Sequence, residues 1–431
     1  MDTQTKYALN RINRRRFLQA VGAAGTLAVG GDLLAACGGT SLGGSSKITL
    51  QQWYHEYGEA GTQQAVLRYA ADYTKSTSTN IKITWVPGDY ATKLSTVLLS
   101  NNPPDVFEHY TFNDNWVKQG LLEPLDDLYT PDTKSDFNPV NLASFTVDGK
   151  IYGVKMFDDT EFFYYRKSLL SQAGIDPTTL TSWDALLEAG KKLTTSKTKG
   201  LFLGNDGGIG LYQLAVYSTG GDLVANNQIA FNTPEVVAAF KKMREVATSS
   251  ATLTGAPTDW LDPSAFIDGL AAIQWSGIWA LPAVIKALGD DFGIIPWPAF
   301  GTSGKPTVPW GGFAEMVCAK SKHIAESKAL VKSLWIDNTA VQQDFCLSYG
   351  FHVPSRKSVA AKATKLQSGP AAEAVKLLNS YGRTNPPLFT NTMNTAVSDA
   401  VSNIVKSNAD AASEVAKAAQ TCKTELQQLL S

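Results

Sequence analysis

The stretch AAIQWSGIW, Ala271–Trp279, decides how the fold is understood, because it places two tryptophans four positions apart. A single helix would put Trp275 and Trp279 on one face, where core packing is the default. The apolar run up to Trp275 is instead typical of a buried strand, and Ser276 is predicted to cap a short helix that begins at Gly277. The two rings are then separated, and Trp279 lies in the first helical turn after a strand end.

Strand and helix patterns alternate on both sides of this stretch. Alternating apolar residues predict strands at 47–54 and 80–87, and helical spacing predicts a helix between them, at 61–77. The same alternation returns beyond residue 157, with an amphipathic helix predicted at 181–194 and Ser182 as its N-cap. This order predicts an α/β fold of mainly parallel sheets flanked by helices. The 431 residues are enough for two such domains.

Residues 1–36 are predicted to be a signal peptide. The adjacent arginines of NRRRFLQ (13–19) precede a short, glycine-rich apolar run, as in a twin-arginine export signal. LLAACGG, Leu33–Gly39, resembles a bacterial lipobox, in which Cys37 is lipidated and becomes the first residue; the alternative is a secretory signal with a chance cysteine. Residues 37–46 are then a flexible Gly/Ser tether that joins the anchor to the folded part.

Charge and residue counts exclude several functions. Cleavage after residue 36 changes the formal charge from −1 to −4, and such a chain offers no basic face for nucleic acid. The four histidines lack metal-binding spacing and no phosphate-binding loop is present, so we expect neither a metal nor a cofactor. Three further cysteines allow at most one disulfide, and buried thiols are the simpler interpretation: Cys318, Cys346 and Cys422.

Five phrases, in order and in register, carry a family resemblance. They are NPPDVFEHY with NWVKQGLLEPLDDL, VDGKIYGVKMF, YYRKSLLSQAGIDPTTLTSWDALLEAGKKL, FIDGLAAIQWSGIWAL and IIPWPAFGTSGKPTVPWGGFAEMVCAKSK. From about residue 47 to its end the chain resembles the family 1 extracellular solute-binding proteins of ABC importers. The resemblance implies a type II periplasmic-binding-protein fold: two hinged lobes, each a mixed, mainly parallel sheet flanked by helices. Mapped onto this chain, lobe 1 is 47–157 continued by 300–338, and lobe 2 is 158–299 continued by 339–431.

The same resemblance implies a function. We expect a monomeric receptor without enzymatic activity, lipid-anchored through Cys37 to the outer face of the bacterial cytoplasmic membrane. It would capture a sugar or oligosaccharide between its lobes, close by a hinge motion and deliver the solute to the permease subunits of an ABC transporter. One alternative is a cationic or peptide solute, held by acidic groups and tryptophan faces. The other, which we favour less, is a secreted glycan hydrolase.

A sugar needs aromatic rings against its C–H faces and polar groups that bridge its hydroxyls. The family's contacts map to Trp279, to Trp310 and Gly311, and to Asp159 as hydroxyl acceptor, with Asp158 beside it. For Trp275, contact with the ligand and packing in the core are equally good interpretations. For the other residues the alternative to ligand contact is core packing or a solvated surface. The remaining candidates follow predicted strands or lie in the NDGGIGLYQ segment: Tyr54, His55, Glu56, His109, Tyr110, Asn113 and Tyr212.

Overall fold

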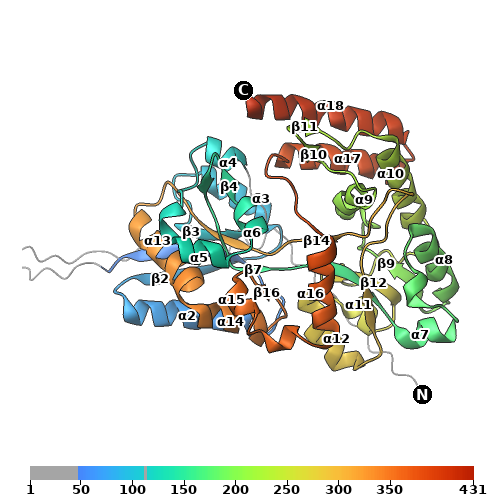
Figure 1. The fold of residues 1–431 in the computed structure, drawn as a ribbon, viewed down its shortest axis with the longest axis horizontal. Coiled ribbons are helices and arrows are strands. Elements are labelled where there is room, and N and C mark those ends of the chain that lie inside the picture. The colour runs from blue at the N-terminus through green and yellow to red at the C-terminus, as the bar shows by residue number, and fades with distance from the viewer. Residues whose placement is uncertain (1–46, 111–113) are drawn as a thin grey trace, which may run out of the picture. The chain divides into compact units, whose positions relative to one another are not determined.

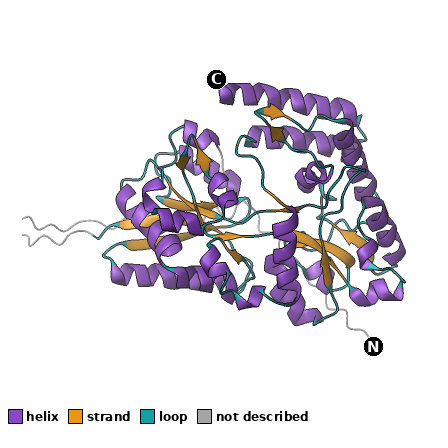
Figure 2. Ribbon diagram, viewed as in Figure 1, coloured by secondary structure: helices purple, strands orange, loops and turns teal. Residues whose placement is uncertain are grey.

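The computed structural model describes residues 47–431 with the exception of 111–113. The predicted signal peptide, Cys37, the tether and Asn113 lie outside the described residues. The described chain carries two larger β-sheets, each flanked by helices, and several two-stranded pairs (Figures 1 and 2). Among the helices of this part of the chain, none combines the length and the apolar character needed to cross a bilayer.

The first sheet has five strands and one antiparallel member. Its order is β2 (Asn80–Val86), β1 (Thr49–His55), β3 (Val106–His109), β15 (Ala314–Val317) and β6 (Val154–Lys155). Strand β1 pairs in parallel with both β2 and β3, whereas β15 runs antiparallel to β3 and to β6. The helix between the first two strands is α2 (Thr62–Ser76), which buries the apolar face predicted from the sequence.

The second sheet has four strands, again with one antiparallel member. Its order is β13 (Gly293–Ile295), β8 (Glu161–Tyr165), β12 (Ala271–Gly277) and β9 (Lys199–Phe202). Strand β12 is parallel to β9, and β8 is antiparallel to both β12 and β13. The predicted two-lobe α/β fold with mixed, mainly parallel sheets is confirmed.

The two antiparallel strands share one cause. The chain leaves β6 at the carboxyl edge of the first sheet and reaches β8 at Glu161, which pairs with Gly277 at the carboxyl end of β12. It returns through 308–313 and enters β15 at Ala314, opposite His109 at the carboxyl end of β3. A strand entered from the carboxyl edge must run against its neighbours. Two crossing segments, 155–161 and 308–314, therefore join the carboxyl edges of both sheets.

Short two-stranded pairs reinforce these crossings. In the first crossing, β7 (Phe157–Asp158) pairs with β16 (Val353–Pro354). In the second, β14 (Val308–Pro309) pairs with β17 (Gly382–Arg383). The two other pairs are β4 (Thr146–Val147) with β5 (Lys150–Ile151) and β10 (Val224–Ala225) with β11 (Gln228–Ile229).

Helices cover both sheets. Besides α2, the described helices of six or more residues are α3 (Tyr90–Leu99), α5 (Pro131–Asp136), α7 (Lys167–Gln172), α8 (Trp183–Leu193), α9 (Tyr212–Ser218), α10 (Pro234–Ala247), α12 (Leu281–Leu288), α13 (Ile324–Lys332), α14 (Thr339–Ser348), α16 (Gly369–Tyr381), α17 (Asn391–Ser407) and α18 (Ala411–Leu430). The shorter ones are α4 (Asp114–Lys118), α6 (Pro139–Ala143), α11 (Ser264–Ile267) and α15 (Lys357–Ala360). Helix α14 packs on α2, and α16 packs on β13. The lobe boundaries drawn from the sequence stay a prediction.

Local chemistry explains the helix starts. Ser182 accepts a hydrogen bond from the Ala185 amide and so caps α8, as predicted. The prediction for Ser276 is wrong, because β12 continues through Gly277 and the turn Ile278–Ala280 begins without a side-chain cap. The pairing of Gly277 with Glu161 is stronger than the local capping preference, so the strand extends two residues beyond Trp275.

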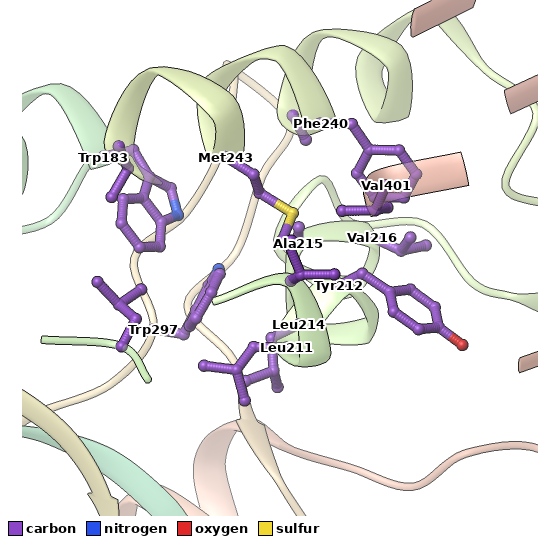
Figure 3. Packing of buried hydrophobic residues seen from close by; sticks show 14 of the residues in the cluster. Trp183, Leu211, Tyr212, Leu214, Ala215, Val216, Phe240, Met243, Trp297 and Val401 are labelled. Carbon is purple, nitrogen blue, oxygen red and sulfur yellow. The ribbon is translucent and has the colours of Figure 1, made fainter. Parts of the chain in front are cut away.

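The core of the second sheet is rich in aromatic rings. Trp183 and Trp297 meet edge to face with centroids 4.6 Å apart, and Met243 lies beside them (Figure 3). A cavity there of about 10 Å³ admits no more than a water molecule. The remaining cysteines are buried free thiols, which confirms that interpretation: Cys318, Cys346 and Cys422.

Candidate functional site

Several of the predicted site residues lie where the crossing segments meet the strand ends. The Ile278 amide donates to the Thr160 carbonyl over 2.9 Å, which ties the turn after β12 to the first crossing. The Gly311 amide donates to the Asp159 carbonyl over 2.8 Å, which ties the second crossing to the first. Candidates that are far apart in sequence thus share one edge, which is where α/β sheets place their ligands.

Trp279 lies half-buried in the 3₁₀ turn that follows β12. Its indole Nε1 donates to the Leu261 carbonyl over 3.0 Å, and the Trp260 ring lies 6.2 Å away at an angle of 53°. The neighbouring Leu261 is 56% exposed. Two tilted indoles beside an exposed leucine form an apolar corner of the kind that a sugar ring can stack on.

The three acidic residues of the first crossing each have an internal partner. Asp158 accepts from the Asn141 amide over 2.8 Å and lies 3.8 Å from the Lys155 ammonium. Burial raises the pKa of Asp158, and the Lys155 charge opposes this shift. Glu161 accepts from the indole of Trp275 over 3.0 Å. Desolvation raises the pKa of Glu161 to about 7.

The third of these residues, Asp159, is paired with a histidine. Its Oδ1 lies 2.7 Å from His352 Nδ1, and His352 Nε2 lies 3.2 Å from Glu59 in the loop after β1. Asp158 and Asp159 therefore face different partners, as adjacent side chains of an extended segment do. They do not form the facing pair of carboxyls that a glycosidase needs.

Close packing shapes the second crossing. Trp310 is half-buried, its amide donates to the Arg383 carbonyl over 2.8 Å, and its ring lies against Gly382. Gly312 has φ +95°, and a Cβ there would approach the Phe157 carbonyl oxygen to 2.2 Å. Only glycine fits this position, because both the conformation and the contact exclude a side chain.

The strand ends of the first sheet contribute rings and a histidine. The His55 ring stacks on Phe313 at 4.4 Å and 16°, and its Nδ1 lies 2.6 Å from the buried carboxylate of Glu108. The His109 ring stacks on Tyr110, which is 53% exposed. These contacts hold His55 through its Nδ1 and leave Tyr110 open to solvent.

Other predicted residues lie deeper or further out. Trp275 is fully buried among the rings of the second sheet, and Tyr54 donates its hydroxyl to buried Glu315. Tyr212 is buried and donates to Asn394 over 2.7 Å. Glu56, in contrast, is exposed on the loop after β1.

Several residues of this site have no signal in their local sequence. The second tryptophan of the corner, Trp260, lies in an irregular segment. It directly precedes Leu261, whose carbonyl accepts the indole of Trp279 from 18 positions further along the chain. His352 is 193 positions from Asp159. Phe313 did have a local signal, because it lies two positions after the predicted contact Gly311.

Known proteins are similar to this chain in sequence. Residues 68–374 match the family model described as bacterial extracellular solute-binding protein. A multiple sugar-binding protein of Streptococcus mutans is 26% identical over 343 residues, 74% of this chain and 78% of the relative. An arabinooligosaccharide-binding protein of Bacillus subtilis is 28% identical over 231 residues, 50% of this chain and 51% of the relative.

Solved structures agree in fold. An ABC transporter solute-binding protein of Thermotoga lettingae, bound with α-D-tagatose, has a TM-score of 0.75 at 18% identity and covers 88% of this chain and 100% of its own. The GacH receptor of Streptomyces glaucescens, solved unliganded and with acarbose, has a TM-score of 0.72 at 24% identity and covers 88% and 99%. Because the family model spans well over half of the chain and the fold agrees, the chain belongs to the bacterial extracellular solute-binding proteins.

Proposed function

We propose that the chain is a receptor that binds a carbohydrate between the carboxyl edges of its two sheets, without turning it over, and delivers it to the permease of an ABC importer. The observation that carries the proposal is the half-buried Trp279, set beside Trp260 and joined through Thr160 to the segment that bears Asp159. An apolar face next to a hydroxyl acceptor matches the two surfaces of a sugar. The sugar-binding names of the relatives support this class of ligand.

The electrostatics favour a neutral ligand over a cationic one. Asp158 is paired with Lys155 and Asn141, and Asp159 is paired with His352. The acidic charges of the first crossing are thus compensated inside the protein. A cationic solute would need carboxylates that lack such partners, because a buried charge is stable only when it is paired.

A thermal-shift screen against neutral mono- and oligosaccharides tests the ligand class. A ligand at a hundred times its dissociation constant stabilises the folded state by about 2.7 kcal/mol, a shift that such a screen detects. We expect a sugar to raise the melting temperature and to change tryptophan fluorescence, with little effect of salt. Stabilisation by amines or peptides alone, weakened steeply by salt, would contradict the proposal.

Chromogenic glycosides test the absence of turnover. We expect no release of the chromophore on incubation with the protein, since Asp158 and Asp159 do not face one bond. Release that is lost in Asp159→Asn would favour the hydrolase instead.

The proposal also covers the N-terminal residues and the oligomeric state of the protein. Residues 1–36 direct export, Cys37 carries the lipid, and the receptor works as a monomer on the outer face of the cytoplasmic membrane. Fractionation of cells that express Cys37→Ser tests the anchor. We expect this variant in the extracellular or periplasmic fraction and the parent chain in the membrane fraction.

A further inference from the structure

His352 lies between two carboxylates that come from different parts of the chain. Its Nδ1 is 2.7 Å from Asp159 Oδ1 and its Nε2 is 3.2 Å from Glu59 Oε1. Glu59 belongs to the loop after β1, Asp159 belongs to the first crossing, and His352 directly precedes β16, which pairs with β7 of that crossing. The imidazole therefore links three segments at the candidate site.

The imidazole is shielded from water and is charged. His352 is 2% exposed, with the ring of Phe157 4.4 Å away and that of Phe345 6.1 Å away. Burial alone lowers the pKa of a histidine, but Asp159 and Glu59 raise the pKa of His352 to about 10. Both ring nitrogens then carry protons at neutral pH: Nδ1 is hydrogen-bonded to Asp159, and Nε2 lies within ion-pair distance of Glu59.

Asp159 is held at one oxygen only. Its Oδ1 contacts His352, whereas its Oδ2 receives no hydrogen bond from any residue in the described ranges, and the side chain keeps 10% exposure. The main-chain carbonyl of Asp159 accepts the Gly311 amide. A carboxylate fixed at one oxygen and at its backbone presents the other oxygen in a constant direction.

We propose that His352 is a positioning residue, which orients the Asp159 carboxylate so that Oδ2 accepts hydrogen bonds from hydroxyls of the bound carbohydrate. The proposal rests on the carbohydrate function proposed above. In this proposal His352 contributes to the affinity for the sugar in addition to the stability of the fold. Glu59 fixes the ring from its Nε2 side.

Two substitutions separate the two contacts of the ring. In asparagine the amide nitrogen is bonded to Cγ, as Nδ1 is, so His352→Asn keeps a donor toward Asp159. In glutamine the amide nitrogen stands one bond further out, near the position of Nε2, so His352→Gln keeps the donor toward Glu59 only. Both variants remove the same charge, so we expect a similar loss of stability from each, measured by urea unfolding.

Isothermal titration with the tightest sugar of the screen measures the effect on binding. We expect His352→Gln to weaken affinity by roughly tenfold or more, the range for a lost hydrogen bond to a charged group, while His352→Asn stays within about threefold of the parent. His323→Gln is the matched control, because this half-buried histidine forms no side-chain cap at α13. It should bind as the parent does.

The outcomes distinguish the possibilities. A loss confined to His352→Gln, and absent when Asp159 is already changed to asparagine, supports positioning through that carboxylate. Equal affinity of both variants and the parent, or an equal loss in both, would overturn it and leave His352 a structural residue. If the parent binds no sugar at all, the carbohydrate function fails first, and the role of His352 fails with it.

Discussion

Gly277→Ala should displace the Trp279 ring without removing it. A Cβ at Gly277 would lie 2.0 Å from Cζ3 and 2.2 Å from Cη2 of that ring. Non-bonded carbons settle at about 3.5–4.0 Å, so the ring must move by roughly 1.5 Å or the end of β12 must bend. The φ of Gly277 is −101°, which alanine adopts freely, so the whole effect comes from this contact.

The size of the effect follows from the exposure of the ring. Trp279 is mostly buried, and a tryptophan side chain has about 200 Å² of surface, so roughly 70 Å² at most is open to a ligand. At about 25 cal/mol per Å², full coverage of that area is worth about 1.8 kcal/mol, and a sugar stacked on one face gains about half of that. We expect affinity to fall by roughly 5- to 20-fold. The added methyl should also reduce the free energy of unfolding by about 1–3 kcal/mol.

Titration calorimetry and urea unfolding measure the two effects separately. Gly58→Ala is the control, because it adds the same methyl group at the edge of the first sheet with no atom within 4 Å. It should change neither affinity nor stability. Wild-type affinity in Gly277→Ala, with the predicted loss of stability present, would show that Trp279 does not touch the ligand.

Three further predictions concern pH, thiols and the anchor. Burial raises the pKa of Glu315 from 4.5 to about 7, so the folded state keeps a proton that the unfolded state releases, and the free energy of unfolding should fall by up to about 3 kcal/mol as the pH rises through this window. Glu315→Gln should remove that part of the slope in urea titrations at pH 5 and pH 8, and an unchanged slope would contradict the assignment. Iodoacetamide should leave the native protein's buried thiols unmodified and alkylate them in urea, as read by mass spectrometry: Cys318, Cys346 and Cys422. Cys37→Ser should release the protein from the membrane fraction, whereas Cys422→Ser should not.

Local patterns were sufficient for much of the fold. Helical spacing predicted the buried face of α2, and capping chemistry predicted the start of α8 at Ser182. Both signals act within a few residues and are therefore readable from the sequence. The end of β12 could not be predicted from local sequence, because its last residue is fixed by pairing with Glu161, more than a hundred positions away.

The candidate site depends even more on contacts between residues that are far apart in sequence. Strand ends and the Trp310-Gly311 segment pointed to the edge where the candidates lie together, but Trp260 and His352 join them through contacts that only the folded chain creates. Trp275 and Trp279 look alike in sequence. One is fully buried and the other half-buried, because both faces of β12 are covered and the chain leaves the sheet after Gly277.

The placement of the candidate contacts on the crossing segments has a mechanical consequence. Any rotation of one sheet relative to the other must change backbone angles within 155–161 and 308–314, since these segments join the two sheets. Asp159 and Gly311 lie in these segments, and the Gly311 amide donates a hydrogen bond to the Asp159 carbonyl. A ligand that contacts Asp159 and Trp279 therefore touches the hinge and the second sheet at once. Such a ligand would bias closure because its contacts differ between the open and closed states. The coupling needs only these direct contacts, without a chain of residues through the lobes.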